Sequence, residues 1–146
     1  MELKFEELPY QLDAVNAVAS LFAGQPNHAR TFDLTSQGTG RFVGNGLDLD
    51  WETLGLNLNA VQKQNGQPET EIRAHGLNFS LEMETGIGKT YVYLRTVYEL
   101  NKLYGWKKFV IVVPSVPIRE GVLKSLEITK AHFDGVFGKP VMRYAE

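Results

Sequence analysis

Seven consecutive residues near the middle of the chain combine glycine, lysine and threonine in an order that suits a polyphosphate. They are Glu84, Thr85, Gly86, Ile87, Gly88, Lys89 and Thr90. Glycine lets a loop curl so that successive backbone amides point at phosphate oxygens. The Lys89 ammonium can reach the β- and γ-phosphates, and the Thr90 hydroxyl can ligate a Mg²⁺ ion that bridges them. These residues therefore predict a site for ATP and Mg²⁺ that positions the triphosphate and neutralises its charge.

The surroundings of this loop decide between two interpretations. A glycine-rich turn whose lysine is simply solvated is the alternative to a phosphate loop. We prefer the phosphate loop because a predicted strand at 77–83 precedes it and a predicted helix at 89–104 follows it. The N-terminus of that helix adds partial positive charge. Where the strict pattern has a glycine, this chain has Met83.

A glutamine far upstream, Gln11, has the chemistry to read a base. Its amide offers one acceptor and two donors, which match the N6 and N7 edge of adenine. Alone it would be read as a surface residue of a predicted helix, but the loop downstream favours base recognition. The residues assigned to nucleotide contact are Tyr10, Gln11, Glu84, Thr85, Gly86, Ile87, Gly88, Lys89, Thr90 and Tyr91. Lys89 and Thr90 are also assigned catalytic roles, and Thr90 is the predicted Mg²⁺ ligand.

A third polar group follows the β-branched run 109–113. Ligands of open α/β sheets gather at the carboxyl ends of strands. Ser115, Arg119 and the amides of the next helix can hold a nucleic-acid phosphate. An ordinary strand-to-helix turn with Ser115 as the helix cap explains these residues equally well. The residues assigned to DNA contact are Pro114, Ser115, Val116 and Arg119.

Composition narrows the class of protein. The chain has 146 residues, a formal charge of −2 and no cysteine. One small domain with a single core fits this length. A disulfide framework and thiolate metal sites are excluded, and any contact with DNA must come from a local surface. The start of the chain is too charged for a signal peptide and no apolar run can span a membrane. We expect a cytoplasmic protein with no membrane contact.

Hydrophobic periodicity predicts the elements that must position these groups. Predicted helices cover 9–22, 51–64, 89–104 and 117–132, and predicted strands cover 31–35, 41–43, 47–49, 77–83, 109–113 and 141–144. Strand, loop, helix, strand and helix in this order indicate βαβ units of an α/β fold. We divide the chain into a base-reading helix at 1–24, a β-hairpin and helix insertion at 25–76, and a core at 77–146. The three histidines show no metal-ligand spacing, and we expect His132 at the surface.

The segment 79–95 resembles motif I of superfamily 2 helicases and, more narrowly, the restriction (Res) subunit of type III restriction–modification enzymes. The start, 3–15, looks like that family's opening with its adenine-reading glutamine. Residues 108–122 look like its motif Ia region, and 57–66 resemble the insertion that such subunits carry before motif I. In helicase-type loops the position of Met83 is often alanine.

The resemblance implies a larger, multidomain enzyme. A Res subunit has two RecA-like motor domains and a C-terminal nuclease domain, works with a modification methyltransferase subunit, and uses ATP to communicate along DNA before cleavage. We therefore expect residues 1–146 to be the N-terminal part of the first motor domain: a partial RecA-like (P-loop NTPase) parallel sheet flanked by helices, with a small β-rich insertion before the phosphate loop. No Asp-Glu box follows Arg119 in the printed sequence. The isolated chain is expected to bind ATP without hydrolysing it efficiently.

Two other functions remain open at this point. One is a superfamily 2 helicase without a nuclease, and the other is a non-catalytic nucleotide-binding or interaction module. An unfinished sheet would also leave unpaired edges, which a homodimer of the fragment would cover.

Overall fold

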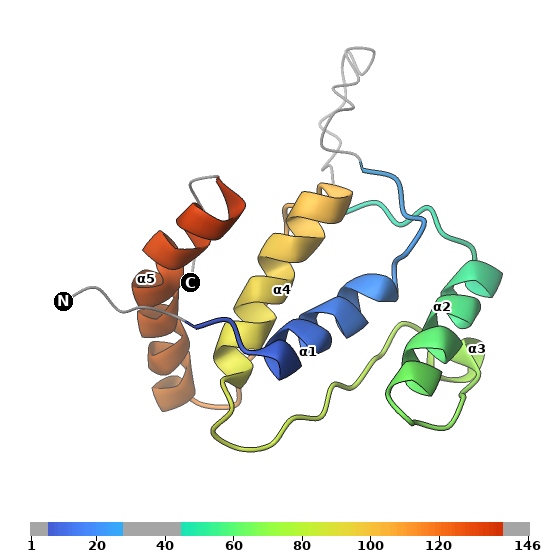
Figure 1. Cartoon of the computed structure of the whole chain (residues 1–146), viewed down its shortest axis with the longest axis horizontal. Coiled ribbons are helices and arrows are strands. Elements are labelled where there is room, and N and C mark those ends of the chain that lie inside the picture. The colour runs from blue at the N-terminus through green and yellow to red at the C-terminus, as the bar shows by residue number, and fades with distance from the viewer. Residues whose placement is uncertain (1–5, 28–44, 139–146) are drawn as a thin grey trace, which may run out of the picture.

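The structure, a computed structural model, describes residues 6–27 and 45–138. These residues form the helices α1 (Pro9–Ser20), α2 (Trp51–Gln64), α3 (Ile72–His75), α4 (Lys89–Tyr104) and α5 (Val116–Phe137). Figure 1 shows α4 between α5 on one side and α1 on the other, with α2 and α3 beyond α1. None of the helices in these ranges is both long and apolar enough to cross a bilayer.

Local chemistry explains where the helices begin and end. The Asp50 carboxylate accepts a hydrogen bond from the Thr53 amide at 2.7 Å and starts α2, and this bond lowers the pKa of Asp50. Gly105 ends α4 with a φ of 73°, and its amide bonds the Asn101 carbonyl at 2.9 Å. The predicted helices 51–64 and 89–104 are confirmed at both ends. Helix α1 ends slightly before the predicted residue 22, and α5 continues past the predicted end at 132.

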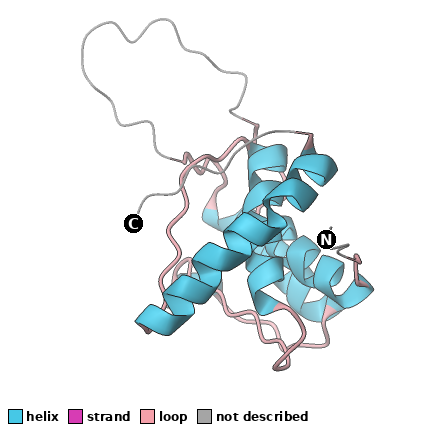
Figure 2. Cartoon of the chain, turned by 90° about the vertical axis from the view of Figure 1, so that its left-hand side faces the viewer, coloured by secondary structure: helices cyan, strands magenta, loops and turns pink. Residues whose placement is uncertain are grey.

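The predicted α/β fold is wrong for the described residues. Segments 47–49, 77–83 and 109–113 were predicted as strands, but none of them forms a strand. Figure 2 accordingly shows helix and loop, and no strand, in the described part of the chain. The partial RecA-like parallel sheet is therefore corrected to a helical arrangement. The predicted strands at 31–35, 41–43 and 141–144 lie outside the described residues.

The reason lies in where backbone hydrogen bonds come from. A helix closes its hydrogen bonds within one segment, whereas a strand needs a neighbouring strand to accept and donate. The β-branched run 109–113 supplies strand propensity but no such neighbour. Val110 and Val112, in the middle of this predicted strand, are 89% and 87% exposed. The homodimer stays a prediction, but the sheet edges from which we argued it are not present in the described ranges.

Helix α4 is packed on two sides. Towards α1, Ala14 and Val15 meet Val92 in one buried cluster, and Ala19 meets Tyr104 in a second. The Tyr104 hydroxyl also donates to the carbonyl of Ala19 at 2.8 Å. Towards α5, aromatic rings fill the interface, and their members are Tyr91, Tyr98, Phe133 and Phe137. The loop that leads into α4 therefore ends on an element held from both sides.

Candidate nucleotide site

The predicted phosphate loop turns and then opens a helix. Thr85 and Gly86 form a turn, and α4 begins at Lys89. Gly86 and Gly88 have φ values of 85° and 88°, in the left-handed region that glycine adopts at little cost. Gly88 is the residue that caps α4, and no side chain caps the helix there. The first amides of α4 are thus not engaged by a capping side chain, which is the arrangement that a phosphate loop needs.

Gln11 reaches this loop from α1. Its Nε2 donates to the carbonyl oxygen of Ile87 at 2.9 Å, and the residue is 7% exposed. The bond uses one of the two N–H donors of the amide, so the second donor and the carbonyl oxygen can serve a base. A peptide bond holds its C=O and N–H on opposite sides. Anchoring the Ile87 carbonyl on Gln11 therefore turns the Gly88 amide away from Gln11.

Two separate features of the structure require glycine at position 88. A Cβ atom there would lie 2.6 Å from Gln11 Nε2, and its φ is unfavourable for other residues. At Gly86, by contrast, a Cβ would meet no atom within 4 Å. Space therefore exists around Gly86, whereas the backbone at Gly88 is in close contact with the predicted base reader.

The residue types at the loop fit Mg²⁺–ATP. Lys89 is exposed and Thr90 is half-buried at the first two positions of α4. Thr90 would hold Mg²⁺, and Lys89 with the loop amides would hold the phosphates. A hollow of about 1500 Å³ lies between α1, α2 and residues 76–84. Tyr10, Glu84 and Ile87 are among the residues that line it. Gln11 thus contacts the predicted phosphate loop directly, whereas Gln11, Lys89 and Thr90 are not among the residues that line the hollow.

The predicted DNA residues form a separate group at the start of α5. Pro114, Ser115, Val116 and Arg119 are all exposed, and none of them belongs to the residues that line the hollow. Ser115 occupies the capping position of α5, but its side chain makes no capping hydrogen bond. The alternative in which the Ser115 hydroxyl caps the helix is therefore not realised. The Arg119 guanidinium pairs with the carboxylate of Glu120 at 3.0 Å.

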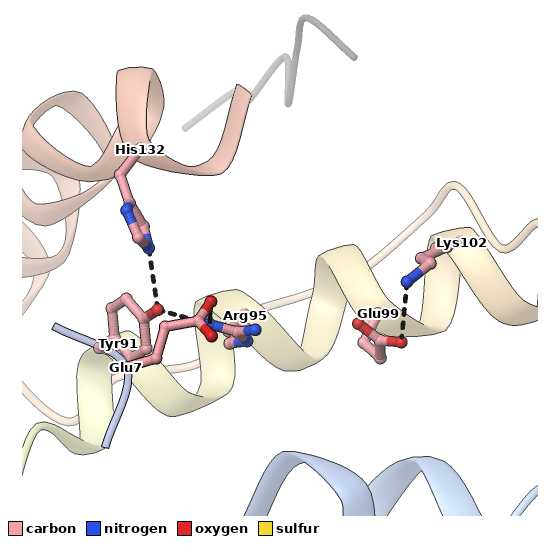
Figure 3. Close-up of polar contacts among 6 residues, drawn as sticks. All are labelled: Glu7, Tyr91, Arg95, Glu99, Lys102 and His132. Atoms are coloured by element: carbon pink, nitrogen blue, oxygen red, sulfur yellow. Dashed lines mark hydrogen bonds and ion pairs between the residues drawn. The ribbon is translucent and has the colours of Figure 1, made fainter. Parts of the chain in front are cut away.

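A polar network beside the loop was not found from the sequence. Arg95 Nη1 donates to Glu7 Oε1 and to the Tyr91 hydroxyl, both at 2.8 Å. The Tyr91 hydroxyl lies 2.9 Å from His132 Nε2 on α5. Figure 3 draws this contact beside the one to Arg95. His132 is thus a half-buried bridging residue and not the surface histidine we expected. The available signal was Arg95 itself, which lies one helical turn from Val92 on the buried side of a predicted helix.

The charges in this network favour a neutral imidazole. Burial lowers the pKa of His132, and the positive charge of Arg95 lowers it further. The charge of Glu7 raises this pKa, but by less than the other two causes lower it. Burial also acts against the charge on Arg95, but the bonds to Glu7 and Tyr91 outweigh it and raise the pKa of Arg95. Because Arg95 donates to the Tyr91 oxygen, the Tyr91 hydroxyl proton can be donated to Nε2 of a neutral His132.

Comparison with known proteins gives the family. A family model described as type III restriction enzyme, res subunit, matches residues 4–135. The EcoP15I Res subunit of Escherichia coli is 31% identical over 144 residues, which cover 95% of this chain and 14% of that protein. The EcoPI Res subunit of Escherichia phage P1 is 30% identical over 143 residues, with the same two shares. The StyLTI Res subunit of Salmonella typhimurium is 48% identical over 58 residues, 38% of this chain and 6% of that protein.

The match with the family model covers most of the chain, and it includes both Gln11 and the phosphate loop. The chain spans 14% of the length of the first two relatives. The segments in which we saw the resemblance all lie within or overlap the matched residues. The chain belongs to the type III restriction enzyme res subunit family.

Proposed function

We propose that this chain supplies the ATP- and Mg²⁺-binding part of a DNA-dependent ATPase and translocase, the restriction subunit of a type III restriction endonuclease. The observation that carries the proposal is the hydrogen bond from Gln11 to the Ile87 carbonyl. It joins two groups 76 residues apart in the sequence, which we assign to different ends of the same nucleotide. Membership of the family supports the class of enzyme.

Each residue has a separate role in this proposal. The second N–H and the carbonyl oxygen of Gln11 read N7 and N6 of adenine. The amides from Gly86 to Thr90, with the Lys89 ammonium, bind the β- and γ-phosphates. Mg²⁺, held by Thr90, would supply charge neutralisation between these phosphates. The remaining residues assigned to this contact, at the margins of the base and the loop, are Tyr10, Glu84, Thr85, Ile87 and Tyr91.

The exposed group at the start of α5 is proposed to contact the DNA backbone. The Ser115 hydroxyl is not used by the helix, and the first residues of α5 are exposed. Arg119 can exchange its exposed partner Glu120 for a phosphate at little cost, because exposed ion pairs contribute little. In the complete enzyme we propose that a modification methyltransferase subunit recognises the DNA site, and that further motor and nuclease domains complete the machine.

Binding of ATP to the chain is tested by titration. We expect wild-type chain to bind a fluorescent ATP analogue with Mg²⁺, and Lys89→Ala to bind it at least about tenfold more weakly. Lys102→Ala is the matched control, because it removes an exposed lysine from the other end of α4. We expect that variant to bind as the wild type does. Equal loss in both variants, or no difference between Lys89→Ala and wild type, would contradict the assignment.

Turnover separates this proposal from its alternatives. We expect the chain alone to hydrolyse ATP slowly, because no Asp-Glu box follows Arg119 in the printed sequence. In an enzyme that joins this chain to the remaining motor and nuclease domains, Lys89→Ala should abolish ATP-dependent DNA cleavage. DNA unwinding without cleavage in that enzyme would favour a helicase without a nuclease. ATP binding without any DNA-stimulated turnover would favour a non-catalytic module.

A further inference from the structure

We infer that Glu7 and Arg95 are positioning residues, which hold the base-reading Gln11 in place against the phosphate loop. This inference rests on the proposed nucleotide site and deepens it. Neither residue is proposed to touch the nucleotide. Their ion pair instead sets where α1 begins relative to α4, and thereby sets the distance between the base reader and the loop.

The start of α1 needs such an anchor. Its capping position is occupied by Leu8, whose side chain cannot cap a helix, and no side chain takes its place. Glu7 directly precedes Leu8, and its carboxylate bonds Arg95 of α4 at 2.8 Å. The backbone amide of Gln11 then bonds the Leu8 carbonyl at 3.0 Å. A short path of polar contacts therefore runs from Arg95 through the first turn of α1 to Gln11.

Arg95 is suited to this task because its own position is fixed. It is 8% exposed, so losing its partners would leave a buried charge uncompensated, which is costly. One partner is the Tyr91 hydroxyl, which also meets His132 of α5. Tyr91 directly follows Thr90 at the start of α4. Figure 3 shows these side chains converging from the N-terminal segment, α4 and α5. The network thus ties the beginning of α1 to the same helical turn that begins the phosphate loop's helix.

A second ion pair on α4 shows the contrast. Lys102 and Glu99 are 3.7 Å apart, lie on the same helix, and the lysine side chain is 63% exposed. The ion pair does not itself join α4 to another element, because both partners belong to α4. The Lys102 ammonium separately lies 5.8 Å from the centre of the Phe137 ring of α5. The Glu7–Arg95 pair joins residues 88 apart in the sequence and has one buried partner. Its removal should move α1 and not α4.

The experiment compares two ligands that share phosphates and differ in the base. Affinities for Mg²⁺–ATP and for Mg²⁺–tripolyphosphate are measured by calorimetry for wild type, Glu7→Ala and Glu7→Gln. We expect Glu7→Ala to lower the ratio of ATP affinity to tripolyphosphate affinity about tenfold, the scale of one hydrogen bond to a charged group. Glu7→Gln keeps an acceptor oxygen and should show an intermediate loss. The preference for Mg²⁺–ATP over Mg²⁺–GTP should fall in parallel.

The matched control is Glu6→Ala, which removes a neighbouring exposed carboxylate. That variant should keep both ratios at the wild-type value. An unchanged ratio in Glu7→Ala, or an equal loss in Glu6→Ala, overturns the positioning role. A general loss of structure would lower both affinities together and leave their ratio unchanged, which also overturns it. If wild type binds neither ligand, or if Lys89→Ala binds both normally, the proposed nucleotide site itself is refuted and this inference falls with it.

Discussion

Helix α4 and the extended segments beside it were both predicted as regular structure, yet only α4 became regular. Leu94 in the middle of α4 is 0% exposed, whereas Val112 in the extended run 109–113 is 87% exposed. The difference is not one of hydrophobicity, because the exposed run 109–113 is wholly apolar, whereas α4 mixes apolar with charged and polar residues. A helix needs a surface to pack on, whereas a strand also needs a partner for its backbone. Helix α4 finds its surfaces on α1 and α5.

The two predicted ligand sites differ in the same way. The nucleotide residues come from α1 and from the loop before α4, and a hydrogen bond from Gln11 joins them. The DNA residues follow the exposed run and begin α5, with their side chains in solvent. Helix packing thus brings the predicted nucleotide residues of α1 and of the loop together, whereas the predicted DNA residues lie exposed at the start of α5.

The largest expected effect on stability comes from shortening one apolar side chain in α4, compared with one in the run 109–113. Leu94→Ala should lower the free energy of unfolding by about 3 kcal/mol, because it leaves a cavity in the packed helix interface. Val112→Ala should change it by no more than about 0.5 kcal/mol. Chemical denaturation followed by circular dichroism measures both. Similar losses in the two variants would show that the extended run is packed in solution.

The next effect concerns the two loop glycines. Alanine at either position should cost about 1 kcal/mol for the left-handed backbone. Gly88→Ala should cost about 1 kcal/mol more, because its Cβ must displace the Gln11 amide and break a partly buried hydrogen bond. Urea unfolding of Gly86→Ala and Gly88→Ala provides the comparison. Equal destabilisation by the two substitutions would mean that Gln11 does not contact the loop.

A smaller loss of stability is expected at the contact between the end of α1 and the end of α4. Tyr104→Phe removes the buried hydrogen bond to the Ala19 carbonyl and should cost about 1 kcal/mol. Tyr93→Phe removes a hydroxyl from the same helix and should stay within about 0.5 kcal/mol of wild type. Thermal unfolding of the two variants is compared at matched pH. If Tyr93→Phe lost as much stability as Tyr104→Phe, the hydrogen bond from Tyr104 to Ala19 would not be the cause of the loss.

The smallest effect is a pH dependence of the α4–α5 contact. Burial, followed by the charge of Arg95, lowers the pKa of His132 below its ordinary value of 6.5. The imidazole of His132 therefore binds a proton more readily in the unfolded chain than in the folded one. His132 contributes stability that is fully present above the ordinary imidazole pKa and is lost as the pH falls through its folded-state pKa. Glu7 and Tyr91 are the other titratable groups that face it.

Replacing His132 tests this dependence directly. His132→Gln should unfold with less loss of stability on acidification than wild type, measured by denaturation at several pH values on both sides of the ordinary imidazole pKa. The glutamine keeps an amide oxygen for the Tyr91 hydroxyl but cannot gain a proton in that range. Identical pH profiles for the two proteins would remove His132 from the explanation.

The long helices and the glycine turn were predictable because their signals are local. Helical periodicity, Asp50 before α2 and the glycines around the loop act within a few residues of one another. The contact between Gln11 and Ile87 was expected only in outline, as two groups that serve one nucleotide. The Arg95 network was not predictable, since nothing in the sequence near Glu7 identifies a partner 88 residues away. The parallel sheet was wrong because strand propensity says nothing about the presence of a neighbour.

The sequence by itself determined the four long helices α1, α2, α4 and α5, the loop that turns at two glycines, and the residue types that suit a triphosphate. These features depend on backbone preferences and on hydrogen bonds between near neighbours. Only the tertiary structure decided which groups meet. It placed Gln11 on the Ile87 carbonyl, enclosed Arg95 between Glu7 and Tyr91, and left the run 109–113 exposed. Packing of α1 and α5 on α4 made those choices, because long-range contacts depend on how whole helix faces fit together.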